Sequence, residues 1–157
     1  MAAEAPATFK VGQFTFARPA AWKWIEAGGM RKAQLQIGEG KSQGEVVFFE
    51  FPAGQGGEVK ANIDRWLGQF QEPREKLQSK TEKVPGKVPV TYVQAEGTYM
   101  SGMPGAPKTA MPNYALQGAI AEAPGGNIFI RLTGPAALVK SSQAEFKKMV
   151  ETAVSGK

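Results

Sequence analysis

The sequence predicts an α+β domain, in which a mainly antiparallel β-sheet has helices packed on both of its faces. Short alternating runs of apolar residues are joined by turns rich in glycine and proline, which is typical of antiparallel strands. Residues 46–49 (Val-Val-Phe-Phe) are all apolar, as expected for a central strand covered on both faces. Residues 58–71 and 142–154 show helical apolar spacing and lie far apart in the chain. Together these features predict an α/β/α sandwich.

Alternating side chains define the strands expected in the first third of the chain. Phe14 and Phe16 are predicted to share one face of a single strand, which Pro19 ends because proline cannot continue a ladder. In the next alternating run, Ala33, Leu35 and Ile37 are expected to face inward. The strands predicted here cover residues 9–16, 22–26, 31–37 and 45–51, with the glycine-rich residues 38–44 as a hairpin connection.

Residues 58–71 form the clearest predicted helix. Its apolar side chains fall on one face, and Pro73 follows as a stop signal. These side chains are Val59, Ile63, Trp66, Leu67 and Phe70. The lysine- and proline-rich residues 81–89 are then expected to connect this helix to the next strand.

The rest of the chain predicts further strands and a second helix. Strands are expected at 90–100, 114–121 and 128–132, with a loop at 101–112 and a tight turn at 124–127. Gly134-Pro135 is expected to break the last strand. Ser142 and Glu145 match a capping box, so the second helix is predicted to span 142–154.

The composition excludes several kinds of chemistry. The chain has 157 residues, which fits one domain, and it contains no cysteine and no histidine. Disulfides, thiol nucleophiles, imidazole bases and histidine-based metal sites therefore cannot form. No carboxylate pair has a spacing that suggests acid–base catalysis, and the glycine-rich segments lack the lysine of a phosphate-binding loop. The sequence therefore predicts no catalytic residue, no cofactor and no enzyme activity.

The net charge of +5 is spread along the chain, with a mild basic concentration at residues 74–87. Nucleic-acid-binding proteins usually carry a denser basic stripe with interleaved aromatic residues, so a nucleic-acid partner is not expected. No apolar run approaches the roughly 20 residues that span a bilayer, so no transmembrane segment is expected.

The first residues have the composition of a flexible segment. Residues 1–8 are mostly small and show no pattern of regular structure, and they resemble the start of an exported protein after its leader has been removed. An ordinary frayed terminus looks the same. We therefore expect a periplasmic or otherwise exported protein, with a cytoplasmic location still open.

Several short motifs resemble those of one known family. The opening Phe-x-Phe-x-x-Pro-x-x-Trp, the tryptophan-bearing helix after the central strand, and Leu-Thr-Gly-Pro before the last helix are similar to those of PsbP-like domains. The matching residues are Phe14, Phe16, Pro19, Trp22, Trp66, Leu132, Pro135, Phe146 and Val150. The chain thus resembles the PsbP/Mog-type α/β/α sandwich family, including its little-characterised exported bacterial members.

The resemblance implies a single PsbP/Mog-like domain over residues 9–157, after the flexible segment 1–8. It implies little about activity, because members include photosystem accessory subunits, a Ran-binding protein and bacterial lipoproteins. The family supplies no shared catalytic motif to carry over. This sequence also has no cysteine to match the lipid-anchoring cysteine of a lipoprotein.

The expected loop around residues 99–112 is the one local anomaly. It contains three of the six methionines, and its prolines and glycines should make it partly rigid. The predicted binding residues are Tyr99, Met100, Met103, Lys108 and Met111. Long loops in compact domains are often functional, so we expect this one to project as a contact surface for a protein partner.

Two other interpretations of the methionines remain open. Thioethers are soft ligands that suit Cu(I), so the loop could bind that metal, although no residue is assigned as a ligand. Methionines also fill irregular apolar gaps, so they could simply pack over the sheet edge. We therefore expect a non-enzymatic binding or accessory module of unknown partner, with a soft-metal Cu(I)-binding protein as the alternative. Trp22 and Trp24 are more distant contact candidates, and the oligomeric state stays open.

Overall fold

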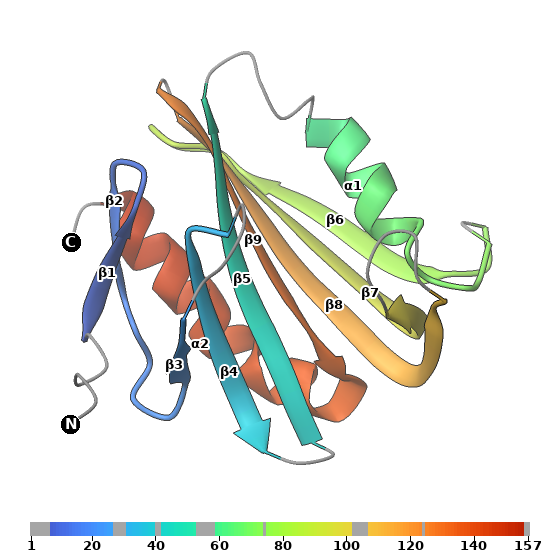
Figure 1. Cartoon of the computed structure of the whole chain (residues 1–157). Helices are drawn as coiled ribbons and strands as arrows, with labels where there is room; N and C mark the ends of the chain where they lie inside the picture. The colour runs from blue at the N-terminus through green and yellow to red at the C-terminus, as the bar shows by residue number, and fades with distance from the viewer. Residues whose placement is uncertain are drawn as a thin grey trace.

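The computed structural model describes residues 7–26, 31–39, 42–52, 59–73, 75–101, 107–123 and 125–155. This part of the chain forms a two-stranded sheet and a seven-stranded sheet, and every ladder in both sheets is antiparallel (Figure 1). The small sheet pairs β1 (Thr8–Val11) with β2 (Phe14–Ala17). A mainly antiparallel α+β fold is thus confirmed.

The large sheet has the strand order β3-β4-β5-β9-β8-β7-β6. Its strands are β3 (Lys23–Ile25), β4 (Ala33–Glu39), β5 (Ser42–Pro52), β6 (Gln78–Val84), β7 (Val90–Ser101), β8 (Thr109–Ala123) and β9 (Gly126–Pro135). The helices are α1 (Val59–Leu67) and α2 (Ala136–Ser155). The central ladder joins β5 to β9, so it links two parts of the chain that are distant in sequence.

The N-terminal strand predicted at 9–16 is in fact a hairpin. Gly12 has a φ of 61°, a left-handed conformation that favours glycine, and the chain reverses there. The reversal stacks Phe9 on Phe16 with ring centroids 5.6 Å apart, and both rings lie edge-on to Phe48 of β5. Strand alternation still holds within each arm, because Phe14 and Phe16 are both buried. The proposed flexible segment 1–8 lies mostly outside the described residues, and β1 begins at Thr8.

Two separate apolar clusters hold the helices to the sheet. Adjacent residues of β9 enter different clusters: Ile128 and Ile130 join the cluster that contains Phe146 of α2, whereas Phe129 joins the cluster that contains Trp66 of α1. Successive side chains of a strand point to opposite faces, which explains the alternation. The predicted central strand shows the same behaviour, since Val46, Val47 and Phe48 are all buried.

Helix α1 is shorter than the predicted 58–71, but the apolar side chains predicted to share its inner face, Ile63, Trp66 and Leu67, are all buried. Trp66 is 6% exposed, and its ring lies edge-on to Phe129 at 6.4 Å. The ring also lies directly on the backbone of β8, because a Cβ atom at Gly118 would collide with it. The helix ends at Leu67, and the following residues turn to bond with β7, where the Gln71 amide donates to the Thr98 carbonyl at 2.7 Å.

Helix α2 begins earlier than predicted. It starts at Ala136, directly after β9. The strand ends at Pro135, where the sequence predicts its break, although Gly134 and Pro135 both still belong to it. Ser142 is buried inside the helix rather than at its start, so the predicted capping box is wrong. The longer helix buries Val139 in addition to Phe146. Within the described residues, neither helix combines the length and the apolar character needed to cross a membrane.

The predicted connection at 81–89 is partly a strand. Strand β6 pairs with β7 along its whole length, from Gln78 opposite Glu96 to Val84 opposite Val90. All of its side chains are exposed, so it carries no apolar alternation that would have identified it. It forms one end of the large sheet.

Trp66→Ala is expected to lower the free energy of unfolding by about 3–5 kcal/mol, as other buried aromatic truncations do. The loss has two sources here, since both the Phe129 contact and the cover over Gly118 disappear. Chemical denaturation of the variant, with exposed Lys60→Ala on the same helix as the control, measures it. A midpoint equal to that of the control would contradict the packing of α1.

Candidate binding groove

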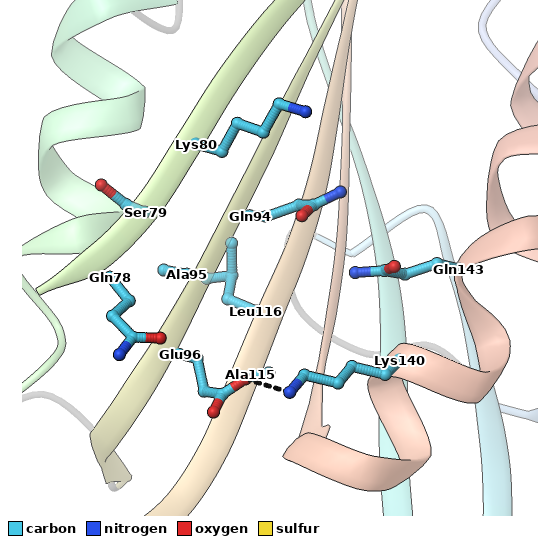
Figure 2. A pocket seen from close by; sticks show the side chains of 10 residues that line it. All are labelled: Gln78, Ser79, Lys80, Gln94, Ala95, Glu96, Ala115, Leu116, Lys140 and Gln143. Carbon is cyan, nitrogen blue, oxygen red and sulfur yellow. Dashed lines mark ion pairs between the residues drawn. The ribbon is translucent and has the colours of Figure 1, made fainter.

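A polar groove lies between α2 and the outer strands β6 and β7. Helix α2 packs against β8, β2, β9 and β5, so the adjoining part of the sheet is left open. A cavity of about 230 Å³ lies at this place. Figure 2 shows the side chains that line it, which come from the strands on one side and from α2 on the other. Its polar lining residues are Gln78, Ser79, Lys80, Gln94, Glu96, Lys140 and Gln143.

Strand register and helix periodicity explain why these side chains meet. Lys80 pairs with Gln94 across β6 and β7, and Gln78 pairs with Glu96 two positions further on, so all four share one face of the sheet. From the helix, Lys140, Gln143 and Lys147 recur at spacings of three and four and therefore lie on one side. The sequence does not predict the groove, because residues 81–84 of β6 read as part of a connection and the predicted second helix begins after Lys140.

Ion pairs bridge the groove from helix to sheet. Lys140 Nζ lies 2.8 Å from Glu96 Oε1, and Lys147 Nζ lies 4.0 Å from Glu82 Oε1. These side chains are partly exposed, so each pair contributes little to stability and can exchange partners easily. Lys147 Nζ also lies 5.2 Å from the centroid of the Tyr92 ring.

Tyr92 is buried beneath these ion pairs. Its hydroxyl has no hydrogen-bond partner among the described residues. Desolvation of the phenol, followed by the negative charges of Glu151 and Glu82, raises the pKa of Tyr92 to about 12. The phenol therefore stays protonated at physiological pH and presents an uncharged donor.

An apolar cavity of about 350 Å³ lies further along α2, and Tyr92 also lines it. Its apolar walls come from the β6–β7 turn and from the last part of the helix, and Glu151 lines it as well. The apolar lining residues are Val84, Pro85, Val88, Val90 and Val154. The spaces beside α2 thus change from polar near Lys140 to apolar near Val154.

A buried amide lies next to the groove wall. Gln117 of β8 is 0% exposed and is the cross-strand neighbour of Gln94. Its Nε2 donates weakly to the Gly118 carbonyl at 3.5 Å, while its Oε1 has no partner among the described residues. A buried acceptor without a partner is costly, so this atom can accept a hydrogen bond from a donor that reaches it.

The predicted methionine loop is largely a two-stranded ribbon. Tyr99 pairs with Met111, and Ser101 pairs with Thr109, so the expected loop at 101–112 is wrong at both of its ends. Pro112, expected to lie in the loop, instead lies within β8 just before Asn113, whose φ is 56°. Met103 lies outside the described residues.

Tyr99 connects the ribbon to the segment that follows α1. Its hydroxyl donates to Gln69 Oε1 at 3.0 Å, and Arg131 Nη1 donates to the same oxygen at 3.1 Å. The Tyr99 ring lies against Phe70 at 5.5 Å and stacks on Tyr114 at 6.2 Å. These contacts give Tyr99 a structural role.

The two described methionines of the ribbon are half-buried and point to different faces. Tyr99–Met111 and Met100–Ala110 are adjacent cross-strand pairs, and adjacent pairs project to opposite faces of a sheet. Lys108 is exposed next to the ribbon. The structure therefore brings Met111 together with Tyr99 but separates Met100 from both. Trp22 is buried and Trp24 packs on Phe9, so neither tryptophan forms an exposed contact surface.

The antiparallel sheet and two helices define a PsbP-like fold. A similar solved structure is the solution structure of cyanobacterial PsbP (CyanoP) from Synechocystis sp. PCC 6803. The two superpose with a TM-score of 0.55 over 88% of this chain and 84% of the other, at 10% sequence identity, so the likeness concerns the fold alone. No protein-family model and no curated protein matches the sequence.

The Tyr92 phenol is expected to ionise near pH 12, against about 10 for an ordinary tyrosine. Because the folded protein holds the proton more tightly than the unfolded chain, Tyr92 should lower stability as the pH rises between these two values and have no effect below them. The difference between the ultraviolet titrations of wild type and Tyr92→Phe isolates this group. Ionisation at the ordinary value would show that the hydroxyl is solvated.

Proposed function

We propose that this protein is a non-enzymatic binding or accessory module that receives a segment of a partner protein along the groove beside α2. The observation that supports this most is that the side chains beside α2 change along the helix, from exchangeable ion pairs at Lys140 and Lys147 to an apolar cavity near Val154. Polar groups that fix orientation beside an apolar pocket that supplies affinity are typical of recognition sites. The ion pairs at Lys140 and Lys147 can open to partner groups at little cost.

The chemistry of the groove favours recognition over catalysis. Glu82 and Glu96 each face a lysine rather than each other, so they do not form an acid–base pair. Tyr92 keeps its proton and is not activated as a base. Among the described residues, no group of three or more acidic side chains is placed to hold a metal ion.

We also propose the finer fold assignment, a PsbP/Mog-like α/β/α sandwich in an exported protein. The alternation along β9 supports the sandwich, because Phe129 packs with α1 while Ile128 and Ile130 pack with α2. The lack of cysteine is compatible with export, since a stray thiol is a liability in an oxidising compartment.

Gln94→Trp is expected to abolish partner binding, because the indole would fill the centre of the groove. Extracts of the source cells would be passed over immobilised wild type, Gln94→Trp and the control Lys10→Trp, which alters the exposed side of β1. A protein retained by wild type and by the control should be lost from Gln94→Trp, with thermal unfolding confirming that all three are folded. Equal retention by Gln94→Trp would place the partner elsewhere.

The methionine ribbon is a second candidate contact surface. Met100 and Met111 offer thioethers on opposite faces, which suits an adaptable apolar contact and disfavours convergence on one Cu(I) ion. The alternative function as a copper-binding protein needs those thioethers to meet.

Replacing Met100, Met103 and Met111 together by leucine is therefore expected to leave Cu(I) affinity unchanged, because the two thioethers that the structure describes, those of Met100 and Met111, lie on opposite faces of the ribbon. Competition with a Cu(I) chelator under a reducing atmosphere measures it. Tight binding by wild type that disappears in the triple variant would restore the copper interpretation.

A further inference from the structure

The outer edge of β6 is a free sheet edge. Strand β6 is the last in the sheet order, it is bonded to β7 on one side, and no described strand pairs with its other side. Every one of its side chains is exposed. The opposite end of the sheet is β3, which has only three residues. A long exposed edge presents unpaired backbone groups that can pair with another strand.

We propose that two copies of this chain associate through β6, with their strands antiparallel about a twofold axis at Thr81. Thr81 then lies opposite Thr81 of the partner subunit, and Lys80 lies opposite Glu82 of the partner subunit. The remaining pairs bring Ser79 opposite Lys83 and Gln78 opposite Val84. The two large sheets would become one continuous sheet.

The charges on β6 select this register among the symmetric ones. In an antiparallel pair, two directly opposite residues either both point their backbone N–H and C=O groups at each other or both point them away. A twofold axis between two copies of one strand must therefore lie midway between two copies of the same residue. An axis at Lys80 sets two lysines against each other, and an axis at Glu82 sets two glutamates against each other. The axis at Thr81 instead creates two pairs of opposite charge and uses the full length of the strand.

The same charges keep other strands away. Lysine on an edge strand normally discourages pairing, because an ordinary strand offers no group to neutralise it. Here Lys80 and Glu82 project to the same face, so a second copy supplies the missing opposite charge on each side. Glu82 remains available, because its contact with Lys147 is long at 4.0 Å and its side chain is half exposed.

A disulfide introduced at the axis tests the register. Since the chain has no cysteine, Thr81→Cys places a single thiol, which should cross-link two copies on mild oxidation. Ser79→Cys is the matched control: in the proposed register the two copies of residue 79 lie roughly 13 Å apart along the strands, beyond disulfide reach. Thr81 pairs with Val93, whose side chain packs with α1, so the thiol lies on the sheet face away from the groove and reports the dimer alone.

Charge reversal tests the pairing energy without a cross-link. Lys80→Glu and Glu82→Lys alone each create two like-charged pairs and should weaken dimerisation about five- to tenfold in sedimentation equilibrium. The double variant should restore it, because the opposite charges return in exchanged positions. Lys10→Glu, on β1, makes the same charge change as Lys80→Glu but lies outside the interface, so it should have no effect.

The results separate the proposal from its rivals. A concentration-dependent dimer that Thr81→Cys traps and Ser79→Cys does not, with rescue by the double charge reversal, supports it. A monomer at all concentrations overturns it. A dimer that both thiol variants trap equally, or that ignores charge reversal, also overturns it, because the interface would then be another surface. Loss of groove binding in Gln94→Trp leaves all of these outcomes unchanged.

Discussion

The contact between Trp66 and Gly118 is the constraint on which one side of the molecule depends. A helix of nine residues is too short to be stable in isolation, so α1 exists because it is held against the sheet. Gly118 leaves the space for the indole, and Phe129 closes it from the side. Once α1 is fixed, the chain that leaves it bonds to β7, and Gln69 can receive hydrogen bonds from both Tyr99 and Arg131. These hydrogen bonds to Gln69 hold Tyr99, and with it the methionine ribbon, in place.

Features that depend on burial could be predicted from the sequence. The alternation of Ala33, Leu35 and Ile37 and the apolar spacing of Ile63 and Trp66 each reflect one buried face, and these side chains are all buried. Element ends were less predictable, because they depend on local backbone conformation. The reversal at Gly12 and the start of α2 directly after Pro135 produce no change in apolar pattern. Ser142 resembled a cap only because its neighbours in sequence fit the motif.

The candidate groove could not be predicted, for a related reason. Its polar side chains are exposed or half-buried, so Lys80 and Gln94 carry no hydrophobic period, and only the register of β6 against β7 brings them together. The loop predicted at 101–112 is too long, because its prolines and glycines indicate irregular structure. Tertiary pairing overrode that tendency, since Met111 lies opposite Tyr99 in a ladder. The spacing of Lys140, Gln143 and Lys147 was the one signal in the sequence that could have indicated a shared face.

The strand order has a consequence for how the chain folds. Strands β6 to β9 follow one another in sequence and pair as neighbours, so they can form through short-range steps. Strand β5 reaches β9 only after a much larger loop closes, which is an entropically demanding and slower step. Until then β9 is an open edge that carries Ile128, Ile130 and Leu132. During synthesis β5 also emerges before β9 exists, so the nascent chain carries an unpaired central strand until its later part is made, and unpaired apolar strand edges favour aggregation in that interval.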